Sequence, residues 1–237
     1  MLNISTKKIR THSKEENSPR WLSTQKGDAL LPALSEEMQM FIEVGRRVSE
    51  EIARATQKNE RLSSQKKADI SGKATEDVIR EHLLSKGLNA SRTRVRIDPS
   101  WQEIDLLILK HGTSPSKTQY YPNEVNIVLE IKNNAVADQT TEIRKNFNKL
   151  KQITRDVRFA VIVLSERDNY KYAIKEEKSG YPVFTLISRK VSAGRWMWSE
   201  SETLAMYNKI MSRGKWTNKK AIEETRKWTE LINFLRR

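Results

Sequence analysis

Three apolar stretches and one amphipathic segment between two of them constrain the fold of this chain most strongly. Residues 125–132 and 157–164 are almost continuously apolar, which is typical of strands buried on both faces of a sheet, and residues 103–109 predict a further strand. Residues 140–153 repeat apolar side chains on one side and predict a helix between the last two strands. A strand meander followed by a helical crossover to another strand indicates an α/β fold with a mixed sheet flanked by helices.

Further elements are expected on both sides of this core. Residues 29–58 place apolar side chains at three- and four-residue steps, which predicts an N-terminal helix that packs either on the main domain or on a second copy of the protein. Residues 72–86 predict a second helix, and the strict alternation in residues 92–97 predicts a strand. The last two predicted elements are a weaker strand at 181–188 and an amphipathic helix at 217–236.

The composition divides the 237 residues into three parts. Residues 1–70 contain a flexible polar arm and the N-terminal helical extension, within which residues 57–70 are either a linker or further exposed helix. Residues 71–190 form the expected core. Residues 191–237 form a basic, Trp-rich C-terminal region.

The charge of the chain indicates a polyanionic partner. The formal net charge is +14, and the last 67 residues alone carry 15 basic and 7 acidic side chains together with four of the six tryptophans. Lys and Arg displace counterions from phosphates and indoles stack on bases, so this region suits nucleic acid. The alternative is that the charges keep the domain in solution and the tryptophans are core residues.

Several classes of protein are excluded or disfavoured. The absence of Cys excludes a disulfide framework, a thiolate zinc site and a Cys nucleophile, and it is compatible with a reducing cytoplasm, where we expect this chain to act. The longest purely apolar run, 159–164, is far too short to span a bilayer, and no helix suits a membrane surface. Three His and eight Gly disfavour His-metal, Ser-His-Asp and phosphate-loop sites.

Acidic and basic groups stand out within the apolar strands. Asp105 interrupts an apolar stretch, which is costly unless a metal, a cation or hydrogen bonds compensate its charge. Glu130 and Lys132 end the following strand, and with a period of two they project to the same face. Oxygen ligands and a cation in a partly dry site are typical of a magnesium site for phosphodiester chemistry.

This pattern resembles the PD-(D/E)xK nuclease superfamily over about residues 71–165. Asp105 matches the motif Asp, and Glu130-Ile131-Lys132 matches the (D/E)xK tripeptide. The helix that contains Glu76 is similar to the one that supplies an accessory Glu, and the later helix and strand complete the family's αβββαβ core. Ile104 stands where the motif has Pro, and the loop at 111–123 accounts for the long step to Glu130.

The resemblance implies a restriction-endonuclease-like core and a role for each of these residues. Asp105, Glu130 and the backbone carbonyl of Ile131 would hold one or two Mg²⁺ ions, for which Mn²⁺ can substitute, and Lys132 would position the attacking water. Glu76 would hold a metal-bound water or a second ion, unless it is a solvated flank residue. Without a metal, Asp105 is a structural acid and Glu130–Lys132 is a surface ion pair.

The expected function is that of a Mg²⁺-dependent endodeoxyribonuclease, in first place a restriction or genome-defence enzyme and next a junction resolvase or mobile-element nuclease. The rivals are a DNA-binding protein that does not cut and an RNase on the same core. Cutting both strands would favour a homodimer. The candidate DNA contacts are Arg92, Arg94, Arg96, Lys149, Arg195 and Lys215. The alternative for the three arginines at 92–96 is that they protect an exposed strand, and the alternative for Lys149 is a solvated helix surface.

Overall fold

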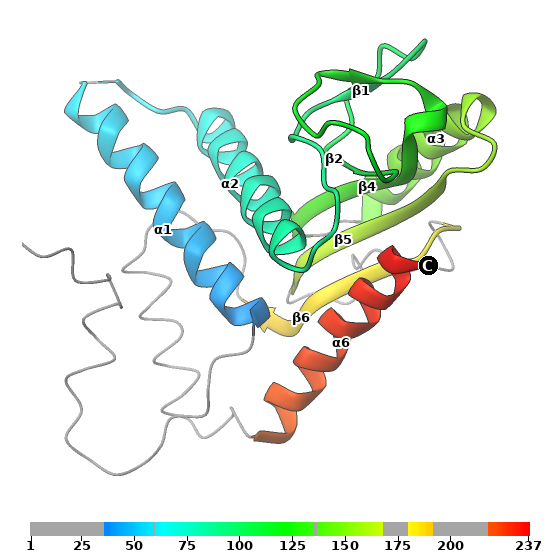
Figure 1. Ribbon diagram of the computed structural model, residues 1–237. Helices are drawn as coiled ribbons and strands as arrows, with labels where there is room; N and C mark the ends of the chain where they lie inside the picture. The colour runs from blue at the N-terminus through cyan, green and yellow to red at the C-terminus, as the bar shows by residue number, and fades with distance from the viewer. Residues whose placement is uncertain (1–35, 59, 135–136, 168–179, 192–217) are drawn as a thin grey trace, which may run out of the picture. The chain divides into compact units, whose positions relative to one another are not determined.

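The computed structural model describes residues 36–58, 60–134, 137–167, 180–191 and 218–237, and it has an α/β arrangement of helices around a mixed sheet (Figure 1). The described residues belong to one compact unit. The elements in chain order are α1 (Glu36–Gln57), α2 (Ser64–Ser85), β1 (Arg96–Ile97), β2 (Leu106–Leu109), β3 (Gln119–Tyr120), a 3₁₀ helix (Pro122–Glu124), β4 (Val125–Asn134), α3 (Ala137–Ile153), β5 (Arg158–Arg167), β6 (Val183–Val191) and α6 (Asn218–Arg236).

The main sheet has four strands in the order β2-β4-β5-β6. Strand β2 is antiparallel to β4, with Leu106 opposite Leu129, whereas β5 is parallel to both of its neighbours. The two inner strands, β4 and β5, contain Leu129, Ala160 and Ile162, which are fully buried. The near-continuous apolar content of these two strands therefore reflects burial on both faces, as expected from the sequence.

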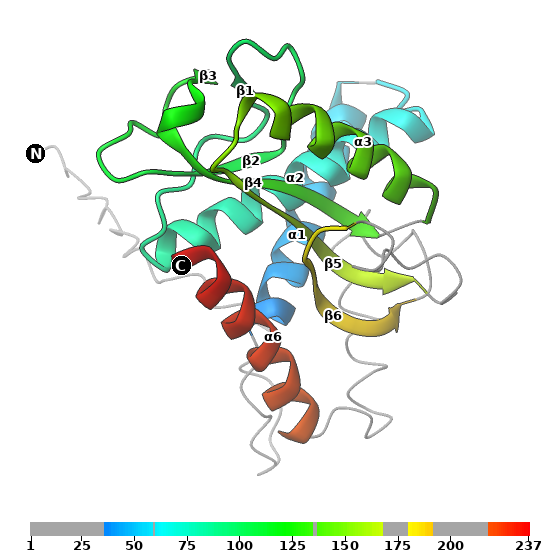
Figure 2. The ribbon, with the colours of Figure 1, turned by 90° about the vertical axis from the view of Figure 1, so that its right-hand side faces the viewer.

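Helices cover both faces of this sheet. Helix α3 lies on one side, and helix α2 lies on the other with α1 packed against it (Figures 1 and 2). Residues of α3 and of the strands share one buried cluster, which includes Phe147 from α3, Val128 from β4 and Val161 from β5. The N-terminal helix packs on its own chain, where Arg47 of α1 forms an ion pair with Glu81 of α2 at 2.6 Å.

Helix α2 begins earlier than the sequence pattern predicts. It starts at Ser64, and the side chain of Ser63 accepts a hydrogen bond from the backbone N–H of Lys66, which satisfies a free amide at the helix start. Residues 64–70 are therefore exposed helix, one of the two interpretations of that polar stretch. Its apolar content was too low to reveal the helix, because this first part is not covered by the sheet.

The strand predicted at 92–97 is interrupted. Arg94 has a φ of 57°, in the left-handed region, so the alternation of faces breaks there. Only Arg96–Ile97 forms strand β1, which pairs in parallel with β3. Two isolated antiparallel bridges still connect this part of the chain to β2 and the residues before it, Ala90 with Ile108 and Val95 with Ile104. The expected three-stranded meander is therefore wrong in its first member, because β1 belongs to a separate two-stranded sheet and the main sheet begins at β2.

Part of the C-terminal region packs as core. Trp228 of α6 is 3 % exposed, and its ring meets the His82 ring of α2 edge-on at 6.3 Å. For this tryptophan the structure favours the core interpretation, while the other three C-terminal tryptophans lie outside the described residues. Among the helices in the described ranges, none has both the length and the apolar content needed to cross a bilayer.

Candidate active site

Asp105, Glu130 and Lys132 meet where β2 and β4 separate. Asp105 lies in a bend directly before β2, and its Oδ2 accepts a hydrogen bond from the backbone N–H of Ile131 at 2.7 Å. On β4, Glu130 Oε1 lies 2.6 Å from Lys132 Nζ. The Leu106–Leu129 register, extended by one residue, places Asp105 opposite Glu130. The three groups therefore share one end of two paired strands, as the sequence predicts.

Strand geometry decides which way these side chains project. Glu130 and Lys132 share a face with Val128, and Val128 belongs to the buried cluster beneath α3. Their side chains are 16 % and 25 % exposed, so they are largely shielded but can be reached from solvent. The apolar sheet thus ends in a polar, partly dry rim, an environment in which electrostatic interactions are stronger than in water.

The surroundings of the Asp105 and Glu130 carboxyl groups disfavour their ionised forms. Burial, together with the charge of Asp105, raises the pKa of Glu130 to about 7 against the opposing effect of Lys132. Burial also raises the pKa of Asp105, although Lys132 and the Ile131 N–H oppose it. Burial alone would lower the pKa of Lys132, but the two carboxyl groups outweigh it and the pKa is raised. A cation bound here would relieve the repulsion between the two acids.

Glu76 is a buried member of the same neighbourhood. Its side chain is 9 % exposed, and its Oε2 accepts a hydrogen bond from Arg94 Nε at 3.0 Å. Burial raises its pKa, Arg94 opposes that effect, and the charge of Asp105 adds to it. Glu76 is therefore not a solvated flank residue. Its role toward a metal-bound water stays a prediction.

The arginines predicted to share one strand face are separated. The left-handed conformation of Arg94 turns its side chain to Glu76, which corrects the expectation of three parallel phosphate contacts. Arg96 lies over the ring of Trp101, with its guanidinium carbon 5.8 Å from the ring centroid. Arg92 is exposed beside α2. Lys149 is exposed on α3, and Arg195 and Lys215 lie outside the described residues.

Two features near the site escaped the sequence reasoning. Trp101, four residues before Asp105, is 85 % exposed, although an indole is costly to leave in water. Asn133 at the end of β4 donates to Ser71 Oγ of α2 at 2.8 Å and so ties the helix of Glu76 to the strand of Glu130. The Trp in a polar turn was a usable signal, whereas nothing in the local sequence indicated the second contact.

The donor set fits a magnesium ion with few protein ligands. No three His, Asp or Glu side chains of the described residues lie close enough together to hold a metal by themselves. Mg²⁺ is commonly bound through one or two carboxylates, with waters and substrate phosphate as its other ligands. Asp105 and Glu130 supply two hard oxygen donors, whose mutual repulsion a divalent cation would offset. Participation of the Ile131 carbonyl stays a prediction.

The raised pKa of Glu130 predicts a pH-dependent stability in the absence of divalent metal. Its folded-state pKa of about 7 lies above the ordinary value of 4.5, so the folded protein retains a proton that the unfolded chain releases. This contribution to stability is fully present below pH 4.5 and is lost as the pH rises through about 7. In EDTA, the thermal unfolding temperature should fall between pH 6 and pH 8 by about 2–4 °C for each kcal/mol lost.

The matched variants separate this effect from other titrations. Glu130→Gln should flatten the dependence of unfolding temperature on pH, whereas Glu60→Gln, at an exposed position of the α1–α2 connection, should retain the native slope. An unchanged slope in Glu130→Gln would contradict the assignment of the raised pKa to Glu130.

Comparison with known proteins gives a partial likeness of fold. No family model matches the chain, and no curated protein does. Among solved structures, NucC from P. aeruginosa ATCC27853 in its cAAA-bound form is 12% identical with a TM-score of 0.41, over 63% of this chain and 74% of that one. NucC from E. coli MS115-1, also cAAA-bound, is 15% identical with a TM-score of 0.39, over 61% and 68%. At these values, function has to be argued from the residues of this chain.

Proposed function

We propose that this chain is a Mg²⁺-dependent endodeoxyribonuclease. The observation that carries the proposal is the meeting of Asp105, Glu130 and Lys132 at one partly buried end of two paired strands. Two partly buried carboxyl groups that repel each other, with a lysine held beside them, are costly to a fold that has no use for them. Such an arrangement is typical of a site that handles phosphate through a divalent cation.

Each residue has a distinct task in this proposal. Asp105 and Glu130 would hold the ion, and the Ile131 N–H keeps the Asp105 carboxylate oriented toward β4. When bound, Mg²⁺ polarises the phosphate and lowers the pKa of a bound water. The Lys132 ammonium would stabilise the negative charge that builds on the phosphate oxygens. Glu76, fixed by Arg94, would orient water on the α2 side of the site.

Nucleic acid as the substrate is supported by charge and by an exposed ring. The formal net charge of +14 suits a polyanion. Trp101 presents an exposed indole four residues from Asp105, with Arg96 over its ring, and this pair suits contact with a base. Within this class we propose a restriction or genome-defence role. A homodimer would place two sites on opposite strands, which the mass in solution tests.

A non-cleaving DNA-binding protein on the same fold is the second candidate. It is favoured by the fact that both acids already have partners within the protein, since Asp105 accepts from Ile131 and Glu130 pairs with Lys132. In that case the trio would serve only to fasten β2 to β4. The two candidates differ in whether Mg²⁺ and Lys132 are needed for any reaction on DNA.

Digestion of supercoiled plasmid tests the proposal. The native protein should nick or linearise the plasmid with Mg²⁺ and leave it intact in EDTA. Lys132→Ala should lower the rate by about a hundredfold or more, the usual cost of removing one group that stabilises the transition state. Lys110→Ala, an exposed lysine just after β2, should cut like the native protein. Labelled RNA offered beside DNA separates an RNase from a DNase. Equal rates for the native protein and Lys132→Ala would remove the assignment.

A further inference from the structure

A cleft lies beside α2, next to the candidate active site. Its volume is about 530 Å³, and it runs between the helix and the loops around residues 92–93 and 115–116. Three basic side chains line it, together with one acid and two hydroxyl groups. These residues are Lys73, Arg80, Arg92, Asp77, Thr93 and Ser116.

The cleft has positive charge that its own residues leave unneutralised. Lys73 and Arg92 are exposed, and within the described residues neither forms an ion pair or side-chain hydrogen bond. Arg80 is anchored by donating its Nε hydrogen bond to the Ser91 carbonyl at 2.6 Å, which leaves its terminal nitrogens for another acceptor. The acid of the cleft, Asp77, accepts a hydrogen bond from Thr93 Oγ1 at 3.0 Å. Three cations thus stand against one carboxylate.

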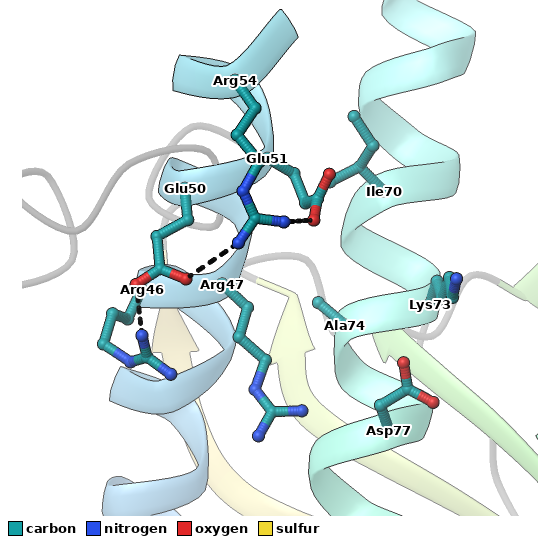
Figure 3. A pocket seen from close by; sticks show the side chains of 9 residues that line it. All are labelled: Arg46, Arg47, Glu50, Glu51, Arg54, Ile70, Lys73, Ala74 and Asp77. Atoms are coloured by element: carbon teal, nitrogen blue, oxygen red, sulfur yellow. Dashed lines mark hydrogen bonds and ion pairs between the residues drawn. The ribbon is translucent and has the colours of Figure 1, made fainter.

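The neighbouring groove between α1 and α2 is different in this respect (Figure 3). Each of its arginines meets a glutamate: Arg46 pairs with Glu50, and Arg54 lies 2.5 Å from Glu51. The third, Arg47, pairs with Glu81. Intramolecular pairing thus offsets the positive charge of these three arginines. Lys73 and Asp77 line both spaces, so the basic side chains particular to the cleft are those of Arg80 and Arg92.

The position of the cleft connects it with the acidic site. Glu76 and Asp77 are consecutive on α2, and so are their partners Arg94 and Thr93 in the adjoining segment. Glu76 and Arg94 face the acidic site, whereas Asp77 and Thr93 line the cleft. The cleft therefore lies one residue along α2 from the acidic site, about 100° around the helix.

We propose that this cleft binds a backbone phosphate of the DNA substrate beside the position of the cut. This inference rests on the proposed function and adds Lys73 and Arg80 to the substrate-binding residues. Guanidinium and ammonium groups form charge-assisted hydrogen bonds to phosphate oxygens, and hydroxyl groups such as that of Ser116 add neutral ones. Contacts of this kind fix the register of the duplex and do not depend on its sequence.

Equilibrium binding of a labelled duplex tests the proposal. Fluorescence anisotropy in EDTA, where no cut occurs, compares the native full-length protein with the double variant Lys73→Gln/Arg92→Gln. The loss of two phosphate contacts should weaken binding about tenfold at physiological salt and reduce the slope of log K against log salt by about two. The control is Lys151→Gln/Arg155→Gln, an exposed lysine and arginine at and after the end of α3, which should bind like the native protein.

The outcomes distinguish the ligand and the two proposals. Equal weakening in the control pair, or none in the cleft pair, would overturn the cleft proposal. Inorganic phosphate that binds the native protein but not the cleft variant, with duplex affinity unchanged, would also overturn it, because the cleft then takes a small free anion. If the native protein cleaves plasmid and the cleft variant binds the duplex with unchanged affinity, only the cleft proposal is refuted. Loss of affinity in a protein that never cuts refutes the nuclease and leaves the cleft as a DNA contact.

Discussion

Asp105→Asn is expected to abolish DNA cleavage while leaving the protein at least as stable as before. An Asn oxygen can still accept the hydrogen bond from Ile131, so the contact between β2 and β4 persists. The negative charge that would hold the metal is lost, and we expect the rate to fall by about a hundredfold to a thousandfold. Plasmid digestion with Mg²⁺ measures this loss.

The effect on stability should have the opposite sign. Burial raises the pKa of Asp105, which means that ionising this carboxyl group is less favourable in the folded protein than in the unfolded chain. Removing the charge should leave the free energy of unfolding unchanged or increase it, as is expected where a fold gives up stability for function. Urea unfolding in EDTA measures this change in the free energy of unfolding.

A matched control and two adverse outcomes make the test sharp. Asp156→Asn changes an exposed acid in the turn between α3 and β5, and it should alter neither cleavage nor stability. Retained cleavage in Asp105→Asn would exclude a catalytic charge at this position. A marked loss of stability would instead show that the carboxylate is a structural acid, the alternative that the sequence left open.

Phe147→Ala should destabilise the protein by about 3–5 kcal/mol. Phe147 of α3 is 1 % exposed, and its ring lies 5.0 Å from the Phe159 ring of β5 and 5.0 Å from the Tyr181 ring before β6. Truncation removes apolar surface from the core and two aromatic contacts at once, and it leaves a cavity between the helix and the sheet.

Urea unfolding followed by far-UV circular dichroism measures this loss. Lys145→Ala, on the exposed side of the same helix, should change the free energy of unfolding by less than about 0.5 kcal/mol. A loss below about 1 kcal/mol in Phe147→Ala would mean that α3 does not pack on the sheet as described. Cleavage by the folded fraction should persist, since Phe147 contacts apolar residues and not the acidic site.

Much of the fold could be predicted because its strands are buried on both faces. The apolar content of β4 and β5 admits few alternatives, and the helix between them follows from a repeat of apolar residues beneath which Val128 and Val161 lie. The start of α2 at Ser64 could not be predicted in this way, because an exposed helical turn carries no apolar pattern. The break at Arg94 was equally invisible, since the alternation around it is regular.

The acidic trio could be located from the sequence for the same reason. Charged residues within apolar stretches are rare, so Asp105 and Glu130 stand out, and the period of two places Glu130 with Lys132. The local pattern contains nothing about the Arg94–Glu76 pair or the cleft at Lys73 and Arg92. The ion pair and the cleft are each formed by residues that lie 18 or 19 positions apart in the chain.

The sequence by itself determined which segments must be buried and which charged groups must be compensated, because hydrophobic burial and the cost of dry charge are properties of each residue and its periodicity. Only the tertiary structure decided the partners of those charges. Asp105 meets the Ile131 amide, and Arg94 turns to Glu76 through a backbone conformation that is unfavourable without its partner. Such pairings depend on how distant segments cross in space, and pairwise contacts of this kind leave no periodic trace in the chain.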